Sequence, residues 1–273
     1  MVVKTRKRTK VPVKKVPEIV TASYGTTSLQ ITAKEMECLE PGTFVIEAVI
    51  DFFNLKHASE CTDPLTMEVV STYFYELLKK PRVLADASNV PEHVNEALRR
   101  VNYLDVQQLH PRFFSASFVF IPINVSDNHW VTAVVYLRHC PEIRREGVIL
   151  IFDSLQGEDS YKVHSSICTH LRDYMNCHWC LKHQLGQMNP SRVFTSDTCP
   201  MCVAKIPEQR NGFDCGLYVL QSCEIVMNNA TEISEKCLLT DEDLGWLSSF
   251  FESKMSFDSV SYREELLNEI REC

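Results

Sequence analysis

Three short apolar runs in the middle of the chain most constrain how it can fold. They comprise residues 118–125, 131–137 and 148–152 and are rich in β-branched and aromatic residues. Such residues favour β-strands, because they pack well on a pleated, half-buried surface. We expect these runs to be buried strands of one sheet, and we expect the charged stretch 138–147 to be a surface loop.

Helical patterns flank this central region on both sides. The expected helices comprise residues 32–38, 43–53, 64–80, 91–101, 161–182, 214–228, 241–254 and 259–271. Helices, then a sheet, then further helices predict an α+β fold with a central sheet flanked by helices. We place this single domain at residues 25–273. Residues 1–24 carry a basic run and two prolines with little periodicity, so we expect them to be a disordered arm.

Composition and charge limit the classes of function. The chain has 273 residues, 45% of them hydrophobic, which is enough for one sizeable core, and no apolar stretch approaches the length of a membrane span. Seven of its 28 basic residues lie within the first 15 positions, whereas the whole chain has 36 acidic residues. The acidic body argues against direct nucleic-acid binding. The basic arm and the lack of an apolar secretion signal predict a nuclear or cytoplasmic protein.

One of the twelve cysteines has a sequence setting that favours a reactive thiolate. Cys215 follows a polar turn, residues 209–214, and opens a strongly apolar helical run. The N–H groups and the dipole at a helix N-terminus favour negative charge on its sulfur. Gly216, which has no side chain, is expected to let a substrate backbone approach the sulfur closely.

A catalytic cysteine also needs a base and a group that orients this base. His129 precedes the second apolar run, and Asp153 directly follows the third. A carboxylate at a strand end can accept a hydrogen bond from an imidazole and fix its tautomer. A histidine before a tryptophan is more often structural, however, and an aspartate at a strand end is usually a turn former.

Five motifs, in this order along the chain, resemble those of the ubiquitin-like-protein-specific proteases, the sentrin-specific, SUMO-removing family. They are Ile121-Pro122-Ile123-Asn124, His129-Trp130, Phe152-Asp153-Ser154-Leu155, Pro207-Glu208-Gln209-Arg210-Asn211 and Asp214-Cys215-Gly216-Leu217-Tyr218. The likeness covers roughly residues 30–270. The surroundings of Gln221 and the spacing after Asp153 are most similar to the branch that trims SUMO chains.

The resemblance implies a papain-like cysteine protease architecture and a thiol protease that cleaves after the C-terminal Gly-Gly of a SUMO-like modifier. It implies the catalytic triad His129, Asp153 and Cys215, with Gln209 as an oxyanion donor. Trp130 and Phe44 would line a narrow tunnel over the two glycines. It implies no cofactor, and the expected partners of a monomeric enzyme are the modifier and its conjugates.

One departure from the family pattern leaves alternatives open. The family usually has Trp-Leu-Asn-Asp or Phe-Leu-Asn-Asp where this chain has Phe44-Val45-Ile46-Glu47. The loss of the Asn-Asp pair puts the choice of modifier in doubt. The alternatives are a protease for another ubiquitin-like modifier, such as the one used in neddylation, and an inactive modifier-binding module.

Two CxxC pairs raise a separate possibility. Cys177 and Cys180 are followed by Cys199 and Cys202 at a spacing that fits a four-cysteine zinc site. A structural zinc would stabilise an insertion at residues 177–202. In the other interpretation the first pair lies at the end of a helix and the second pair on a strand.

Overall fold

The computed structural model describes residues 17–62, 65–79, 110–184, 192–256 and 258–272, and the fold is built around a mixed five-stranded sheet. Its strands are β3 (Met67–Val69), β4 (Phe118–Val125), β5 (His129–Cys140), β6 (Arg145–Phe152) and β7 (Met201–Val203), which lie in this order across the sheet. The outer pairs β3–β4 and β6–β7 are parallel, and the inner pairs are antiparallel. The three strands expected from the apolar runs are confirmed, as is the α+β fold.

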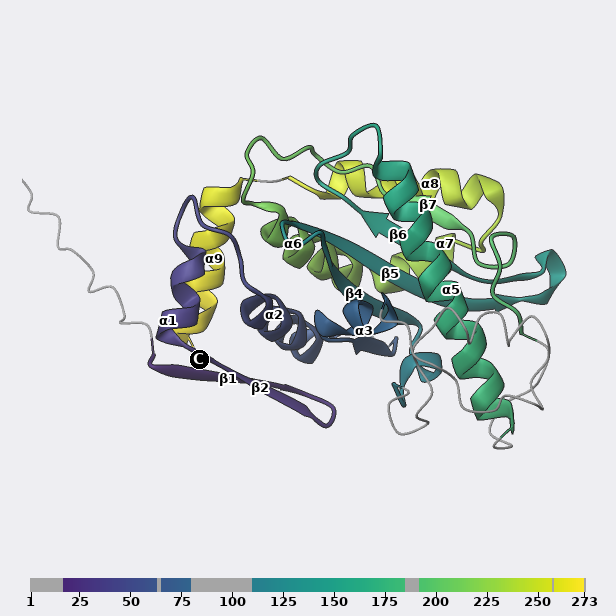
Figure 1. Ribbon diagram of the computed structural model, residues 1–273, viewed down its shortest axis with the longest axis horizontal. Coiled ribbons are helices and arrows are strands. Elements are labelled where there is room, and N and C mark those ends of the chain that lie inside the picture. Colours follow the sequence, from purple (N-terminus) through teal and green to yellow (C-terminus); the bar gives the residue numbers. More distant parts are fainter. Residues whose placement is uncertain (1–16, 63–64, 80–109, 185–191, 257, 273) are drawn as a thin grey trace, which may run out of the picture.

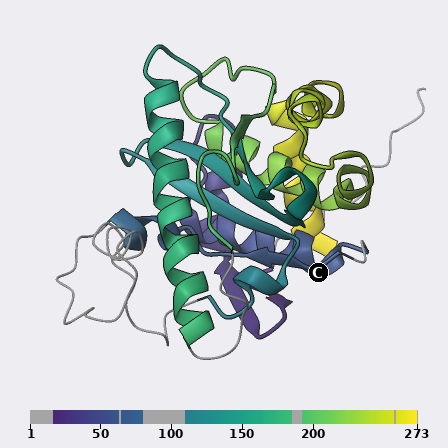
Figure 2. The same ribbon diagram turned by 90° about the vertical axis from the view of Figure 1, so that its right-hand side faces the viewer.

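The central strands are buried at most positions because both faces of the sheet are covered. Successive side chains alternate between two core clusters, since a strand points its residues to opposite faces. On one face, α2 (Glu47–Glu60) and α6 (Cys215–Asn228) pack against Val134 and Leu150. On the other, the long helix α5 (Ser160–Gln184) packs against Val135 and Ile149 and crosses the sheet in Figure 2. Cys215 therefore begins a helix on one face of the sheet, whereas His129 and Asp153 lie at the ends of its strands β5 and β6.

The structure of the N-terminal segment differs from the disordered arm expected at residues 1–24. Residues 1–16 lie outside the described residues, but β1 (Ile19–Tyr24) pairs with β2 (Thr27–Thr32) in an antiparallel hairpin. Val20 and Ala22 are buried in the core cluster that contains α2, so the boundary at residue 24 was placed too late. Thr32 then caps α1 (Ala33–Met36) through a reciprocal hydrogen-bond pair with Glu35, which starts the helix where it was expected.

Other expected elements need correction as well. The helix expected at residues 64–80 is β3 followed by α3 (Tyr73–Lys79), and α2 begins at Glu47 rather than directly after Thr43. Most of the loop expected at 138–147 is strand, because β5 and β6 extend into it around the short turn η4 (Pro141–Ile143). The helix expected at 91–101 lies outside the described residues.

The chain closes with helices on the α6 side of the sheet. They are α7 (Ala230–Lys236), α8 (Asp241–Lys254) and α9 (Ser259–Glu272), and the last two match the sequence expectation closely. Figure 1 shows α9 beside α1 and the hairpin, so the two ends of the described chain meet. Within the described part of the chain, no helix is both long and apolar enough to cross a membrane.

Candidate active site

Cys215 is the first residue of α6, at the helix N-terminus that the sequence predicts, and Asp214 occupies the N-cap position without a side-chain cap hydrogen bond. The cysteine exposes 1% of its surface, so its sulfur lies below the molecular surface. The space that a side chain at Gly216 would occupy is filled by other residues and is not open to a substrate. A Cβ there would lie 2.8 Å from Val45 Cβ and 3.4 Å from Ile50 Cδ1. Gly216 therefore allows the segment before α2 to pack closely on α6, and its expected role beside the substrate is not what the structure shows.

His129 and Asp153 meet at one edge of the sheet. His129 is the first residue of β5, and Asp153 directly follows β6, which runs antiparallel to β5. Because the start of one antiparallel strand lies beside the end of the next, the two side chains are brought together. His129 Nε2 lies 2.7 Å from Asp153 Oδ1, and this part of the expected geometry is present.

The carboxylate of Asp153 has two further donors. His164 Nε2, from the first turns of α5, lies 2.7 Å from Oδ2, and the backbone N–H of Leu155 donates to Oδ1 at 2.9 Å. Burial alone would raise the pKa of Asp153, but the hydrogen bonds from His129, His164 and Leu155 outweigh it and hold the pKa below its usual range. His164 is not among the residues predicted for the site, because only helical periodicity marks its position in the sequence.

The ionised carboxylate determines the proton positions on His129. A carboxylate can only accept, so Nε2 of His129 carries a proton, and Nδ1 is the atom left to exchange one with Cys215. Nδ1 is buried and has no hydrogen-bond partner among the described residues, while Cys215 is one of the groups that raise the pKa of the ring. Burial would lower the pKa of His129, but Asp153 and Cys215 outweigh it and raise the pKa to about 9.

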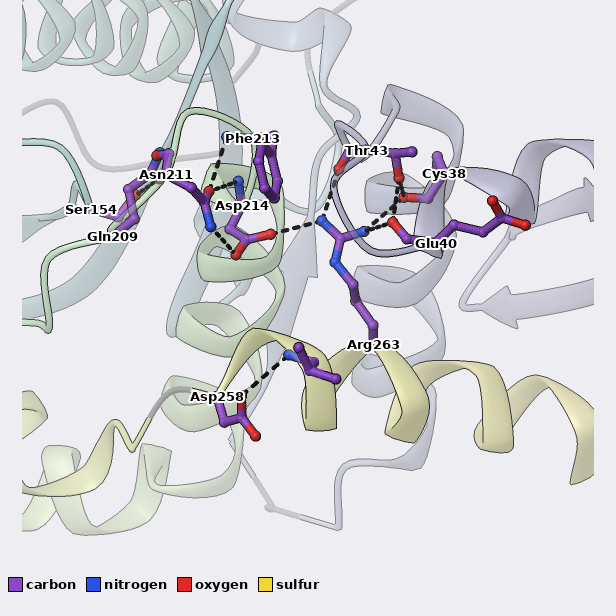
Figure 3. Close-up of polar contacts among 11 residues, drawn as sticks. Cys38, Glu40, Thr43, Ser154, Gln209, Asn211, Phe213, Asp214, Asp258 and Arg263 are labelled. Carbon is purple, nitrogen blue, oxygen red and sulfur yellow. Dashed lines mark hydrogen bonds and ion pairs between the residues drawn. The ribbon is translucent and has the colours of Figure 1, made fainter.

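Gln209 is held beside this edge by both ends of its side chain. Its Oε1 accepts from Ser154 Oγ at 2.7 Å, and its Nε2 donates to the carbonyl of Asn211 at 2.6 Å (Figure 3). The backbone N–H of Gln209 also donates to the Ser154 carbonyl. Since Ser154 follows Asp153 directly, these bonds tie the Gln209 loop to the strand end that carries the carboxylate. One N–H of the Gln209 amide remains for a ligand.

The turn before Cys215 is fixed by a partly buried hydrogen-bond network. Asn211 Oδ1 accepts from the backbone N–H groups of Phe213 and Asp214, and Asn211 Nδ2 donates to Asp214 Oδ2 at 2.7 Å. Arg263 from α9 donates to Asp214 Oδ1 at 2.8 Å, as Figure 3 shows. A surface hollow of about 600 Å³, lined in part by Gln209, Asn211 and Asp214, lies next to this turn. A rigid loop thus separates the nucleophile from an open polar space.

The two aromatic residues expected at the tunnel lie in different surroundings. Trp130 is 5% exposed and belongs to the core cluster that also contains Cys215. Phe44 is 53% exposed, directly before Val45, which contacts Gly216. The segment carrying Phe44 therefore lies against the helix that starts with Cys215, with its ring available to a ligand.

The four CxxC cysteines do not converge. Cys177 and Cys199 are buried in the core cluster on the α5 face, whereas Cys202 belongs to the cluster on the opposite face. Burial raises the pKa of Cys199 and of Cys202 to about 12. The described residues contain no group of three or more potential metal ligands, so the possible zinc site of Cys177, Cys180, Cys199 and Cys202 has no structural support there.

Comparison with known protein families and curated proteins gives a consistent result. The family described as "Ulp1 protease family, C-terminal catalytic domain" matches residues 44–259. Sentrin-specific protease 7 of Mus musculus is 24% identical over 255 residues, which cover 72% of this chain and 23% of that protein. Ubiquitin-like-specific protease 2 of Saccharomyces cerevisiae is 22% identical over 229 residues, covering 75% of this chain and 19% of that protein. The chain thus spans about a quarter or less of the length of these relatives.

Solved structures share the fold. A structure described as that of "the de-sumoylating protease" has a TM-score of 0.59 at 20% identity, covering 93% of this chain and 90% of that one. The C-terminal Ulp1 protease domain in complex with Smt3, the yeast orthologue of SUMO, has a TM-score of 0.53 at 18% identity, covering 94% and 89%. At these identities the likeness shows the fold alone.

Proposed function

The chain belongs to the Ulp1 protease family, and from that premise we propose that it is a thiol protease that cleaves after the C-terminal Gly-Gly of a SUMO-like modifier. The observation that carries the proposal is the imidazole of His129, which Asp153 holds through Nε2 and whose pKa Asp153 and Cys215 together raise. This arrangement supplies a nucleophile, a base and an orienting carboxylate from three separate elements.

The proposed reaction uses these groups in order. His129 Nδ1 takes the proton of Cys215, whose sulfur attacks the carbonyl carbon of the last glycine. The oxyanion is stabilised by the free N–H of Gln209 and by the backbone N–H of Cys215 at the start of α6. His129 then donates its proton to the departing lysine amine, which leaves a thioester. Water, deprotonated by His129, attacks this thioester and releases the glycine carboxylate and the free thiol.

The burial of Cys215 supports selection for glycine. A sulfur that is 1% exposed can be reached only through a narrow approach, which favours residues without a Cβ. The exposed ring of Phe44, and Trp130, which follows His129 in the chain, would line that approach. We propose deconjugation as the main activity, and precursor processing and chain trimming use the same cleavage step.

An electrophile test identifies both the nucleophile and the modifier. Purified protein is incubated with SUMO, ubiquitin and the modifier used in neddylation, each bearing a thiol-reactive group at its C-terminus. We expect the SUMO probe to label Cys215, Cys215→Ser to abolish labelling and cleavage, and Cys140→Ser, a matched variant on β5, to keep both. Labelling by another probe alone would identify a different modifier. A folded wild-type protein that binds SUMO without labelling would be a binding module.

The compartment is a second proposal. The basic run at residues 4–15 has the composition of a nuclear-import signal, so we propose a nuclear protein with a cytoplasmic fraction. Fusion of residues 1–16 to a fluorescent protein tests this, and a uniform distribution would contradict it.

A further inference from the structure

The carboxylate of Asp153 is shared between two histidines. His129 approaches Oδ1 from β5 and His164 approaches Oδ2 from α5, each at 2.7 Å. The His164 side chain is 3% exposed and that of Asp153 is 4% exposed, so this contact is buried. A triad of cysteine, histidine and aspartate does not by itself require the second imidazole.

Proton positions follow from the charge of Asp153. Its carboxylate is ionised, so Nε2 of His164, like that of His129, carries a hydrogen and donates it. Oδ1 accepts from His129 and from the Leu155 N–H, whereas His164 is the donor that the described residues give to Oδ2. Both oxygens are therefore held, and the carboxylate plane has one orientation.

The backbone that carries His164 is rigid. Ile167, Cys168 and Leu171, which are buried against the sheet, lie three, four and seven positions further along α5 and share its inward face. This packing fixes the helix relative to β6, at whose end Asp153 lies. His164 can thus transmit the position of α5 to the carboxylate.

We propose that His164 is a positioning residue for the hydrolysis proposed above, on which this inference rests: its Nε2–H holds Asp153 with Oδ1 in line with Nε2 of His129. This hydrogen bond keeps Oδ1 2.7 Å from Nε2 of His129, where the negative charge of the carboxylate favours the protonated imidazole. His129, His164 and Cys215 interact with this centre, and Lys205, Glu208 and Glu252 line a surface hollow together with Asp153.

The test compares two substitutions of His164. In His164→Gln, the amide Nε2–H can replace the imidazole Nε2–H, whereas His164→Leu fills similar space without a donor. His170→Gln is the matched control, because His170 lies on the same helix and its Nδ1 lies 2.9 Å from the Tyr75 hydroxyl rather than near Asp153. The rate at which a SUMO probe labels Cys215 is measured, together with the titration of His129 by NMR.

We expect His164→Leu to label about 10- to 100-fold more slowly, the range set by the loss of one hydrogen bond to a charged group. The titration midpoint of His129 falls toward its ordinary value in this variant, because Oδ1 is no longer held in line. His164→Gln keeps most of the rate and the midpoint, and His170→Gln matches the wild type in both.

Three outcomes would overturn the inference. They are a wild-type rate and midpoint in folded His164→Leu, a midpoint that rises, and a loss in His164→Gln as large as in His164→Leu. The NMR titration needs no turnover, so it separates this inference from the proposed function. A wild-type chain that no modifier probe labels would refute the protease, while a lowered His129 midpoint in His164→Leu would still support the positioning.

Discussion

The guanidinium of Arg263 lies 2.8 Å from the carboxylate of Asp214, the residue that precedes Cys215, and both side chains are 3% exposed. The same guanidinium donates to the backbone carbonyls of Cys38, Glu40 and Thr43 (Figure 3). One side chain from α9 therefore connects the N-cap of the catalytic helix to the loop that leads to Phe44.

Removal of this guanidinium is expected to be costly. Arg263→Met leaves Asp214 buried without its cation and leaves the three carbonyls without this donor, so we expect a loss of about 3–5 kcal/mol in the free energy of unfolding. Urea unfolding measures it. Lys236→Met breaks an exposed ion pair with Glu232 and is expected to leave the free energy of unfolding nearly unchanged. Equal losses of unfolding free energy in the two variants would mean that the buried Arg263–Asp214 pair stabilises the fold no more than an exposed ion pair does.

Gln209 is expected to act on the chemical step. Gln209→Ala removes the side-chain oxyanion donor, so kcat should fall about 100- to 1,000-fold with little change in KM. Ser154→Ala removes the hydroxyl that holds Oε1 of Gln209 but keeps the donor itself. We expect a smaller fall in kcat for this variant. Steady-state kinetics on a SUMO fusion substrate distinguishes the two, and a change confined to KM in Gln209→Ala would contradict an oxyanion role.

The sequence predicted the parts of the site that local patterns encode. A polar turn before an apolar helical run indicated Cys215, and the ends of two apolar runs indicated His129 and Asp153. Antiparallel pairing of β5 and β6 brings the latter two together, as neighbouring strands in sequence usually pair. The role of Gln209 came from the family resemblance, because a loop glutamine has no pattern of its own.

The missed features depend on contacts between distant segments. Arg263 and Asp214 are 49 positions apart, and nothing near either residue marks the other. The strands β3 and β7 have three residues each and are defined by parallel pairing with β4 and β6, so no alternation is visible in them. The hairpin of β1 and β2 is stabilised by packing on α2, which local composition does not show.

Close packing at Gly216 predicts a steric effect. In Gly216→Ala the new Cβ would lie 2.8 Å from Val45 Cβ, which is joined to the backbone and cannot rotate away. We expect the free energy of unfolding, measured in urea, to fall by about 1–3 kcal/mol, which is typical of overpacking. Gly245→Ala, within α8, has no atom within 4 Å of its new Cβ and should instead stabilise the protein by about 0.5–1 kcal/mol. If Gly216→Ala leaves the free energy of unfolding unchanged, the segment at Val45 can shift to make room for the new methyl group.

The raised pKa of His129 predicts how stability and activity depend on pH. Its folded-state pKa of about 9 exceeds the ordinary value of 6.5, so its interactions with Asp153 and Cys215 stabilise the fold fully below pH 6.5. This contribution is lost as the pH rises through about 9. Over the same range the imidazolium that protonates the leaving amine disappears, so cleavage should also decline.

Asp153→Asn removes the largest interaction that raises this pKa, and its residual activity should decline at a lower pH than that of the wild type. Thermal melts and single-turnover cleavage between pH 6 and 10 measure both effects. An alkaline decline at the same pH in the two proteins would show that His129 is not the titrating group.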